Sequence, residues 1–233
     1  MGFEVDLLFS VAGSFTAGGM NIWQLASFGE LEDLKKLKDN GVALDEQDER
    51  GFTPLGWACR NGHYDVVNYL ISENCSLEKQ SFAGMRPIHH ACNKNHEKII
   101  RLLLRSGCQV NGTDENGDTP MHWACSRGIL NIIVAILDAG GDGTLPNQQG
   151  VTPLHKAAIF GQLAVVKKLI EFGANVDLQD SNGDTALHIA SRSGFTSMVK
   201  YLLETGAKKV TNKAGVTPKD SALGPSILKL FGE

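Results

Sequence analysis

The chain has few of the features that mark a membrane-spanning or nucleic-acid-binding protein. No apolar run approaches the roughly 18 residues needed to cross a bilayer, so we expect no membrane insertion. With 22 Lys and Arg against 26 Asp and Glu, the net charge is -4 and the pI is about 6.0. Binding to phosphates needs a basic face, so this balance argues against nucleic acid as a partner.

Recognisable catalytic motifs are also absent. The sequence has no G-x-S-x-G motif, no glycine-rich phosphate loop, and no Cys–His pair with a third residue to orient it. The extra histidines His63, His90 and His96 show no zinc-ligand spacing. We therefore expect no enzyme activity, no cofactor and no metal ion.

What the sequence does contain is a phrase of six residues that recurs at a fixed interval. In its fullest form the phrase reads Thr-Pro-Leu-His-x-Ala, and degenerate copies begin at Asn21 and Thr217. The five better copies start at positions that differ by 33 residues each time, namely Thr53, Arg86, Thr119, Thr152 and Thr185. The chain is therefore built from seven related units.

The residues around each phrase predict a turn, a short helix, a second turn, a second helix and a loop. In the unit that starts at Asp114, Gly117 suits a turn that needs positive φ, and Thr119 and Pro120 suit a helix start. Gly128 interrupts the helical pattern between the two helices. A second helix is indicated by apolar residues at helical spacing, which are Ile129, Ile132, Ile133, Ile136 and Leu137.

The unit that contains Arg86 departs from this pattern at two positions. Arg86 replaces the threonine cap, which removes about 1 kcal/mol of helix stabilisation. Asn95 replaces the inter-helix glycine, and asparagine is the non-glycine residue that best tolerates positive φ. We expect this unit to be the least regular of the array.

The 33-residue phrase resembles the ankyrin-repeat family. The resemblance implies an all-α solenoid of helix-turn-helix units with β-turn fingers, in which each unit contacts its neighbours. Residues 1–19 are predicted to be an N-terminal extension that is mobile or docked on the first repeat, and residues 20–233 form the repeat domain. The units fall at about 20–47, 48–80, 81–113, 114–146, 147–179, 180–211 and 212–233.

The five cysteines follow the same interval. Cys59, Cys92 and Cys125 are spaced by 33 residues, and so are Cys75 and Cys108. Both sets occupy slots where the repeat consensus has alanine, so we predict small, buried and reduced packing residues rather than metal ligands or disulfides. An odd number of reduced thiols fits the cytoplasm, with the nucleus as the other possible compartment.

Four histidines occupy the fourth place of the phrase: His89, His122, His155 and His188. The resemblance implies that each one hydrogen-bonds turn backbone within and between repeats. Successive histidines would then lie about one repeat apart, too far to share a metal ion. We predict that this ladder is structural.

The resemblance places the variable residues of each unit on a concave face made by the fingers and the first helices. Aromatic side chains and arginines, which are enriched at binding hot spots, occur at several of these positions. The predicted partner-binding residues are Arg50, Phe52, Trp57, Arg60, Phe82, Met85, Glu115, Asp118, Trp123, Arg127, Ile159, Phe160 and Arg192.

These observations predict a monomeric, non-catalytic protein–protein interaction module, an adaptor or scaffold that binds a partner protein through the concave face. One alternative is a gankyrin-like proteasome-assembly chaperone, suggested by residues 25–32 and 224–229, although the Leu-x-Cys-x-Glu motif of that group is absent. The other alternative is the regulatory or targeting portion of a larger enzyme or channel, against which the polar, altered last unit weighs.

Overall fold

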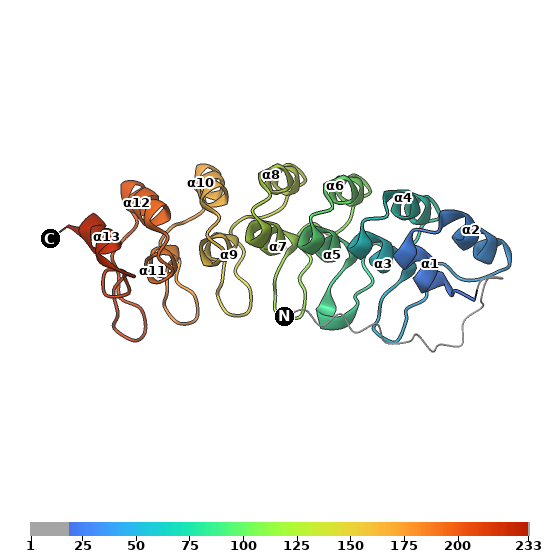
Figure 1. Ribbon diagram of the computed structural model, residues 1–233, viewed down its shortest axis with the longest axis horizontal. Helices are drawn as coiled ribbons and strands as arrows, with labels where there is room; N and C mark the ends of the chain where they lie inside the picture. The colour runs from blue at the N-terminus through green and yellow to red at the C-terminus, as the bar shows by residue number, and fades with distance from the viewer. Residues whose placement is uncertain (1–18, 233) are drawn as a thin grey trace.

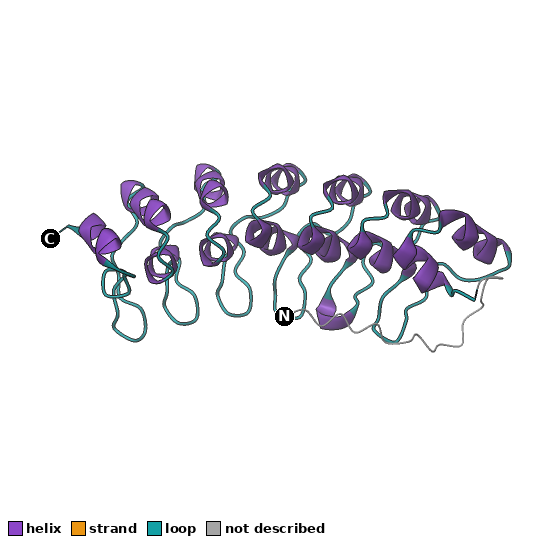
Figure 2. Cartoon of the chain, in the orientation of Figure 1, coloured by secondary structure: helices purple, strands orange, loops and turns teal. Residues whose placement is uncertain are grey.

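The computed structural model describes residues 19–232, so nearly all of the predicted N-terminal extension lies outside the described residues. Helices pair along a single elongated stack, with an inner row and an outer row of helices and long loops projecting beyond the inner row (Figure 1). Within residues 19–232 the secondary structure is helical and contains no strand (Figure 2). The predicted all-α solenoid is confirmed.

The two rows contain alternate helices of the chain. The inner row consists of α1 (Ile22–Phe28), α3 (Pro54–Asn61), α5 (Pro87–Lys94), α7 (Pro120–Arg127), α9 (Pro153–Ile159) and α11 (Ala186–Arg192). The outer row consists of α2 (Leu31–Asp39), α4 (Tyr64–Ser72), α6 (Glu97–Arg105), α8 (Leu130–Asp138), α10 (Leu163–Glu171) and α12 (Thr196–Glu204). The stack ends in the short α13 (Pro225–Leu228) and the 3-10 turn η2 (Lys229–Phe231).

The helix boundaries follow from the capping residues that the sequence supplies. The Thr53 hydroxyl accepts the Gly56 N–H at 3.0 Å, and Pro54 fills the first helical position, where its missing N–H costs nothing. Between the inner and outer helices the chain takes a left-handed turn at Gly62 (φ 87°) and at Asn95 (φ 60°). Asn95 therefore does replace the glycine in conformation as well as in sequence.

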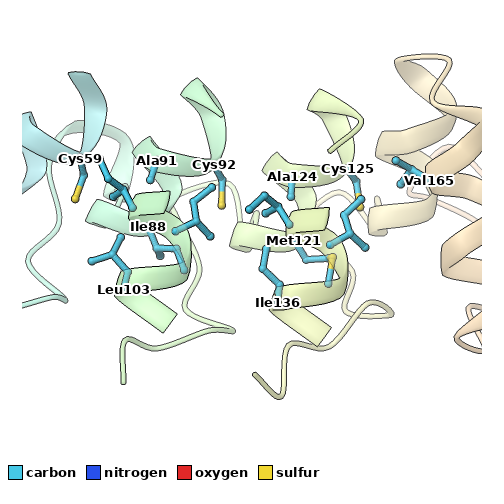
Figure 3. Close-up of a cluster of buried hydrophobic side chains, with 14 of the residues drawn as sticks. Cys59, Ile88, Ala91, Cys92, Leu103, Met121, Ala124, Cys125, Ile136 and Val165 are labelled. Atoms are coloured by element: carbon cyan, nitrogen blue, oxygen red, sulfur yellow. The ribbon is translucent and has the colours of Figure 1, made fainter. Parts of the chain in front are cut away.

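The core is a continuous layer between the two rows of helices. In α8, Ile132, Ile133 and Ile136 are completely buried, as the apolar spacing predicted. All five cysteines are free and buried, which confirms the packing interpretation. Cys59, Cys92 and Cys125 occupy equivalent places in successive units (Figure 3).

The long loops are fingers that are hydrogen-bonded internally and to one another. In the first complete finger, the Asp48 carboxylate accepts the N–H groups of Arg50 and Phe52 at 2.9 and 2.8 Å. Each finger tip also donates one backbone N–H to the preceding tip, as Phe82 does to the Arg50 carbonyl at 2.9 Å. The same bond joins Glu115 to Ala83, Gln148 to Asn116, Ser181 to Gln149 and Lys213 to Asn182. The tips therefore form one connected row.

The finger of the Arg86 unit is irregular, as predicted. Ser81 stands where the other fingers carry Asp or Asn, and a serine hydroxyl stabilises such a turn more weakly. The Ser81 hydroxyl here contacts the Met85 carbonyl and His90 Nε2 instead. The chain here forms the 3-10 turn η1 (Phe82–Gly84), with positive φ at both Ala83 (58°) and Gly84 (68°). Arg86 still joins neighbouring units, because its guanidinium lies 3.0 Å from Glu78 and 2.6 Å from the Thr113 carbonyl.

Candidate binding surface

The histidine ladder connects the inner helices to the fingers. His122 Nδ1 accepts the Thr119 N–H at 3.1 Å, and its Nε2–H donates to the Val151 carbonyl of the next unit at 2.9 Å. His155 and His188 make the equivalent pairs of bonds. His89 accepts the Arg86 N–H at 3.0 Å but has no cap hydroxyl beside it, and its Nε2–H donates to the Gly112 carbonyl of its own unit at 3.0 Å. The predicted structural role of the ladder is confirmed.

Burial favours the neutral form of His89, His122 and His155 by lowering their pKa values. Desolvation lowers the pKa of His89 to about 4 and also lowers the pKa of His122 and His155. His90 lies beside the ladder, donates to or accepts from the Ser81 hydroxyl at 2.7 Å, and has a pKa of about 3 because it too is buried. The backbone N–H at Nδ1 fixes the Nε2–H tautomer, so the ring makes both hydrogen bonds only while it is uncharged.

The position just before each helix cap proves to be buried, which corrects part of the predicted surface. Its occupants are Phe52, Met85, Asp118, Val151 and Asp184, and all are at most 8% exposed. The resemblance had indicated a freely variable surface slot here. The slot lies inside the joint between finger and helix, where a side chain packs against the first turn of the inner helix.

Phe52 and Asp118 occupy the same position in their units but make different contacts. The Phe52 ring stacks on Trp57 at a centroid distance of 4.2 Å, and the two residues flank the helix start as a hydrophobic staple. Asp118 instead accepts the Asn147 amide at 2.7 Å and pairs with Lys156 Nζ at 2.7 Å. In both cases the side chain joins parts of the fold and is not presented to a partner.

The two tryptophans also belong largely to this joint. Trp57 is only 7% exposed, and its indole N–H donates to the Asp48 carboxylate at 2.8 Å. Trp123 is half-buried and donates to Asp114 at 3.1 Å in the same way. Of the predicted binding residues, the structure therefore buries four: Phe52, Trp57, Met85 and Asp118.

All but one of the remaining predicted residues lie in two places in their units, the finger tips and the C-terminal ends of the inner helices. Arg50, Phe82 and Glu115 are exposed at finger tips. The exposed or half-buried residues near the helix ends are Arg60, Arg127, Ile159, Phe160 and Arg192, whereas the half-buried Trp123 lies in the middle of α7. We call the surface formed by the finger tips and the C-terminal ends of the inner helices the inner surface.

Large apolar side chains are exposed on the inner surface. Phe82 is 51% exposed at its finger tip and packs one side against Phe52, with a centroid distance of 5.6 Å. Ile159 and Phe160 are 44% and 55% exposed at the end of α9. Phe28, 64% exposed, was missed as a candidate, although it holds the slot of Phe160 in the first unit. Comparing that unit with the others would have found it.

The charges of the inner surface fall into two groups. Towards the C-terminus, Arg192 is paired with Asp184 at 2.8 Å, as Lys156 is with Asp118. Arg60 instead lies over the rings of Phe52 and Trp57, 5.7 Å from each centroid, in a cation–π arrangement. No carboxylate within the described residues pairs with Arg60.

Two further findings concern residues 19–232 as a whole. None of their helices is both long enough and apolar enough to span a membrane. No three His, Cys, Asp or Glu side chains among them come together in a group that could hold a metal ion.

Comparison with known proteins identifies the class to which this repeated fold belongs. The family model described as ankyrin repeats (3 copies) matches residues 22–114, 73–147 and 135–214. The chain therefore belongs to the ankyrin-repeat family, whose members generally serve as protein-interaction modules.

Individual relatives are similar over short segments, whereas solved structures are similar over most of the chain. Human DNA-binding protein RFXANK is 42% identical over 57 residues, which are 24% of this chain and 22% of that protein. Human protein phosphatase 1 regulatory subunit 27 is 46% identical over 44 residues, 19% of this chain and 29% of that protein. Each match thus spans less than a third of the relative.

Two crystal structures of ankyrin domains superpose on nearly the whole array. The ankyrin repeat domain of human ASB11 has a TM-score of 0.83 and 26% identity, covering 92% of this chain and 99% of that one. The ankyrin repeat domain of Bcl-3, a member of the IkappaB family, has a TM-score of 0.79 and 25% identity, covering 93% and 99%.

Proposed function

We propose that this chain is a non-catalytic module that binds a partner protein through its inner surface and serves as an adaptor or scaffold. The observation that carries the proposal is the exposure of Phe82, Ile159 and Phe160 in slots where the fold needs no large apolar side chain. A ring left half in water gains free energy when a partner covers it, at about 25 cal/mol per Å² of apolar area. Aromatic residues with polar neighbours are typical of interface centres.

The rigidity of the surface supports the same proposal. Each finger tip is hydrogen-bonded to the next, and each ladder histidine links an inner helix to a finger. A partner that binds across several units therefore contacts side chains whose backbone is already held in place by these hydrogen bonds. Little conformational entropy is lost on binding, which increases the affinity available from a modest contact area.

The test compares two double variants of the full chain in affinity capture from cell lysate with quantitative mass spectrometry. Phe82→Ala with Phe160→Ala removes exposed rings from the inner surface. Tyr64→Ala with Phe172→Ala is the matched control, because these rings are 40% and 51% exposed but lie on the outer row, at the start of α4 and directly after α10.

The proposal predicts a set of proteins that the wild-type chain and the control retain and the inner-surface variant loses. Retention of the same proteins by all three chains would move the binding site elsewhere. Both variants should keep the wild-type far-UV circular dichroism spectrum, since the altered side chains are half in solvent. The narrower gankyrin-like role, and the role as part of a larger enzyme or channel, stay predictions.

A further inference from the structure

We propose that the inner surface recognises an acidic, extended segment of its partner, in which carboxylates spaced by about three residues lead to one apolar side chain. This inference rests on the proposed function and adds the chemistry of the partner. It is carried by three cations on successive inner helices, Arg60, Lys94 and Arg127, and by the apolar pair Ile159 and Phe160 on the next helix.

The three cations form no salt bridge with any carboxylate within residues 19–232. Arg60, Lys94 and Arg127 lie near the ends of α3, α5 and α7, and none of them takes part in an ion pair there. The next basic side chains along the row, Lys156 and Arg192, are neutralised by Asp118 and Asp184. Among the basic side chains of the inner helices, the ones without an ion pair therefore lie in three neighbouring units, in a chain whose net charge is -4.

Two of the three cations are held in place by neutral groups. The Arg60 guanidinium lies over the Phe52 and Trp57 rings, which hold one of its faces and leave its N–H edge available for a carboxylate. Arg127 donates a hydrogen bond to the Asn93 side chain, which lies on the preceding inner helix α5. Such contacts orient the guanidinium groups without cancelling their charge, which reduces the entropy lost when an anionic partner binds.

The carboxylates of the inner surface do not oppose this arrangement. Its exposed acidic residues, Glu49 and Glu115, lie at finger tips, away from the helix ends in sequence, and neither is paired with Arg60, Lys94 or Arg127. A partner segment that runs along the helix ends therefore meets positive charge in three units and apolar side chains in the fourth.

The spacing of the row sets the spacing of the partner. Packed helices lie about 8–10 Å apart, and an extended chain advances about 3.3 Å per residue. One carboxylate about every three residues therefore meets one cation per unit. One further step of about three residues brings an apolar side chain to Ile159 and Phe160. Three cations beside exposed apolar groups suit an acidic peptide better than nucleic acid, which needs a longer basic track.

The experiment is a selection of displayed random 12-residue peptides on the immobilised full chain, followed by affinity measurements on the enriched peptides by fluorescence anisotropy. One variant removes the row: Arg60→Gln, Lys94→Gln and Arg127→Gln. A matched control changes the net charge equally on the outer helices: Lys98→Gln, Arg105→Gln and Lys167→Gln, all of them exposed and none in an ion pair within the described part of the chain. The Phe82→Ala, Phe160→Ala chain is measured in parallel.

We expect enriched peptides with acidic residues three apart and a Leu or Phe at one end. Their affinity should fall at least about 30-fold on the row variant and about twofold or less on the control. The same peptides should weaken when NaCl is raised from 0.1 to 0.5 M, because exposed charges are screened.

Two other results would be decisive. Enriched peptides that lack acidic residues but still lose affinity on the Phe82→Ala, Phe160→Ala chain would refute the acidic segment and leave the proposed function standing. Enriched peptides whose affinity changes on neither inner-surface variant would contradict both proposals.

Discussion

Replacing His122 by alanine tests whether the histidine ladder holds the inner helices to the fingers. The substitution leaves two buried backbone groups without their partner. These are the Thr119 N–H, which now donates to Nδ1 at 3.1 Å, and the Val151 carbonyl, which now accepts from Nε2 at 2.9 Å. Thr119 and Val151 are 1% and 8% exposed, so bulk water does not reach these groups in the folded state.

The expected loss of stability follows from these two groups. A buried polar group that loses its partner costs about 1–3 kcal/mol, so two such groups bound the loss at roughly 2–6 kcal/mol. A water molecule in the space of the imidazole can restore one of the bonds. We therefore expect the free energy of unfolding of His122→Ala to fall by about 3 kcal/mol at pH 7.

The assay is urea denaturation followed by circular dichroism, with two comparison variants. His122→Gln should recover part of the loss, because an amide oxygen can accept from Thr119 or an amide N–H can donate to Val151. His96→Ala removes a single bond, from Nε2 to the Arg60 carbonyl at 3.1 Å, and should cost about 1 kcal/mol. A loss for His122→Ala no larger than for His96→Ala would refute the reasoning.

Three further predictions concern burial. Phe52→Ala should lower the free energy of unfolding by about 3–5 kcal/mol, and Phe82→Ala by less than about 1, in the same urea assay; equal losses would contradict the observed burial. The pKa of an unfolded histidine is about 6.5, whereas the folded pKa values are about 4 for His89 and about 3 for His90. Between pH 6.5 and pH 4 these two histidines therefore bind protons in the unfolded chain but not in the folded one. The contribution of each histidine to the free energy of unfolding should therefore be complete above pH 6.5 and should fall by about 2 kcal/mol as the pH drops to 5. Equal urea midpoints at pH 7 and pH 5 would contradict this prediction. Finally, native thiols should react slowly with an aromatic disulfide reagent, because burial raises the pKa of Cys75 to about 11 and of Cys108 to about 12; fast modification of three or more of the five would contradict this.

The sequence predicts the helices well because the same capping and turn residues recur in successive units. A threonine cap, a proline at the first turn and a glycine at positive φ mark α3, α7 and α9, whereas α11 lacks the proline and α5 lacks the threonine and has Asn95 in place of the glycine. The least regular unit was expected from Arg86 and Asn95, but its irregularity lies in the finger after Ser81, which these two residues do not locate. The positive φ of Ala83 (58°) has no local signal, because alanine is not a residue that favours this conformation.

The binding surface was predicted less well, because periodicity finds a variable slot but not its exposure. Phe52 and Asp118 share one slot, and both are buried for different reasons, a ring stack and an ion pair. Only the approach of the next finger and the turn of the inner helix shows that this slot faces inward. Slots at the helix ends have no such neighbour, and the prediction that Phe160 is exposed there is confirmed.

Hydrogen–deuterium exchange of the full chain, with and without a protein that it captures, tests the central proposal most directly. We expect slower exchange on binding in peptides that contain the finger tips at residues 81–85 and 114–118 and the C-terminal end of α9, and unchanged exchange in α4 and α8. Protection confined to the outer helices, with the finger tips unchanged, would contradict binding through the inner surface.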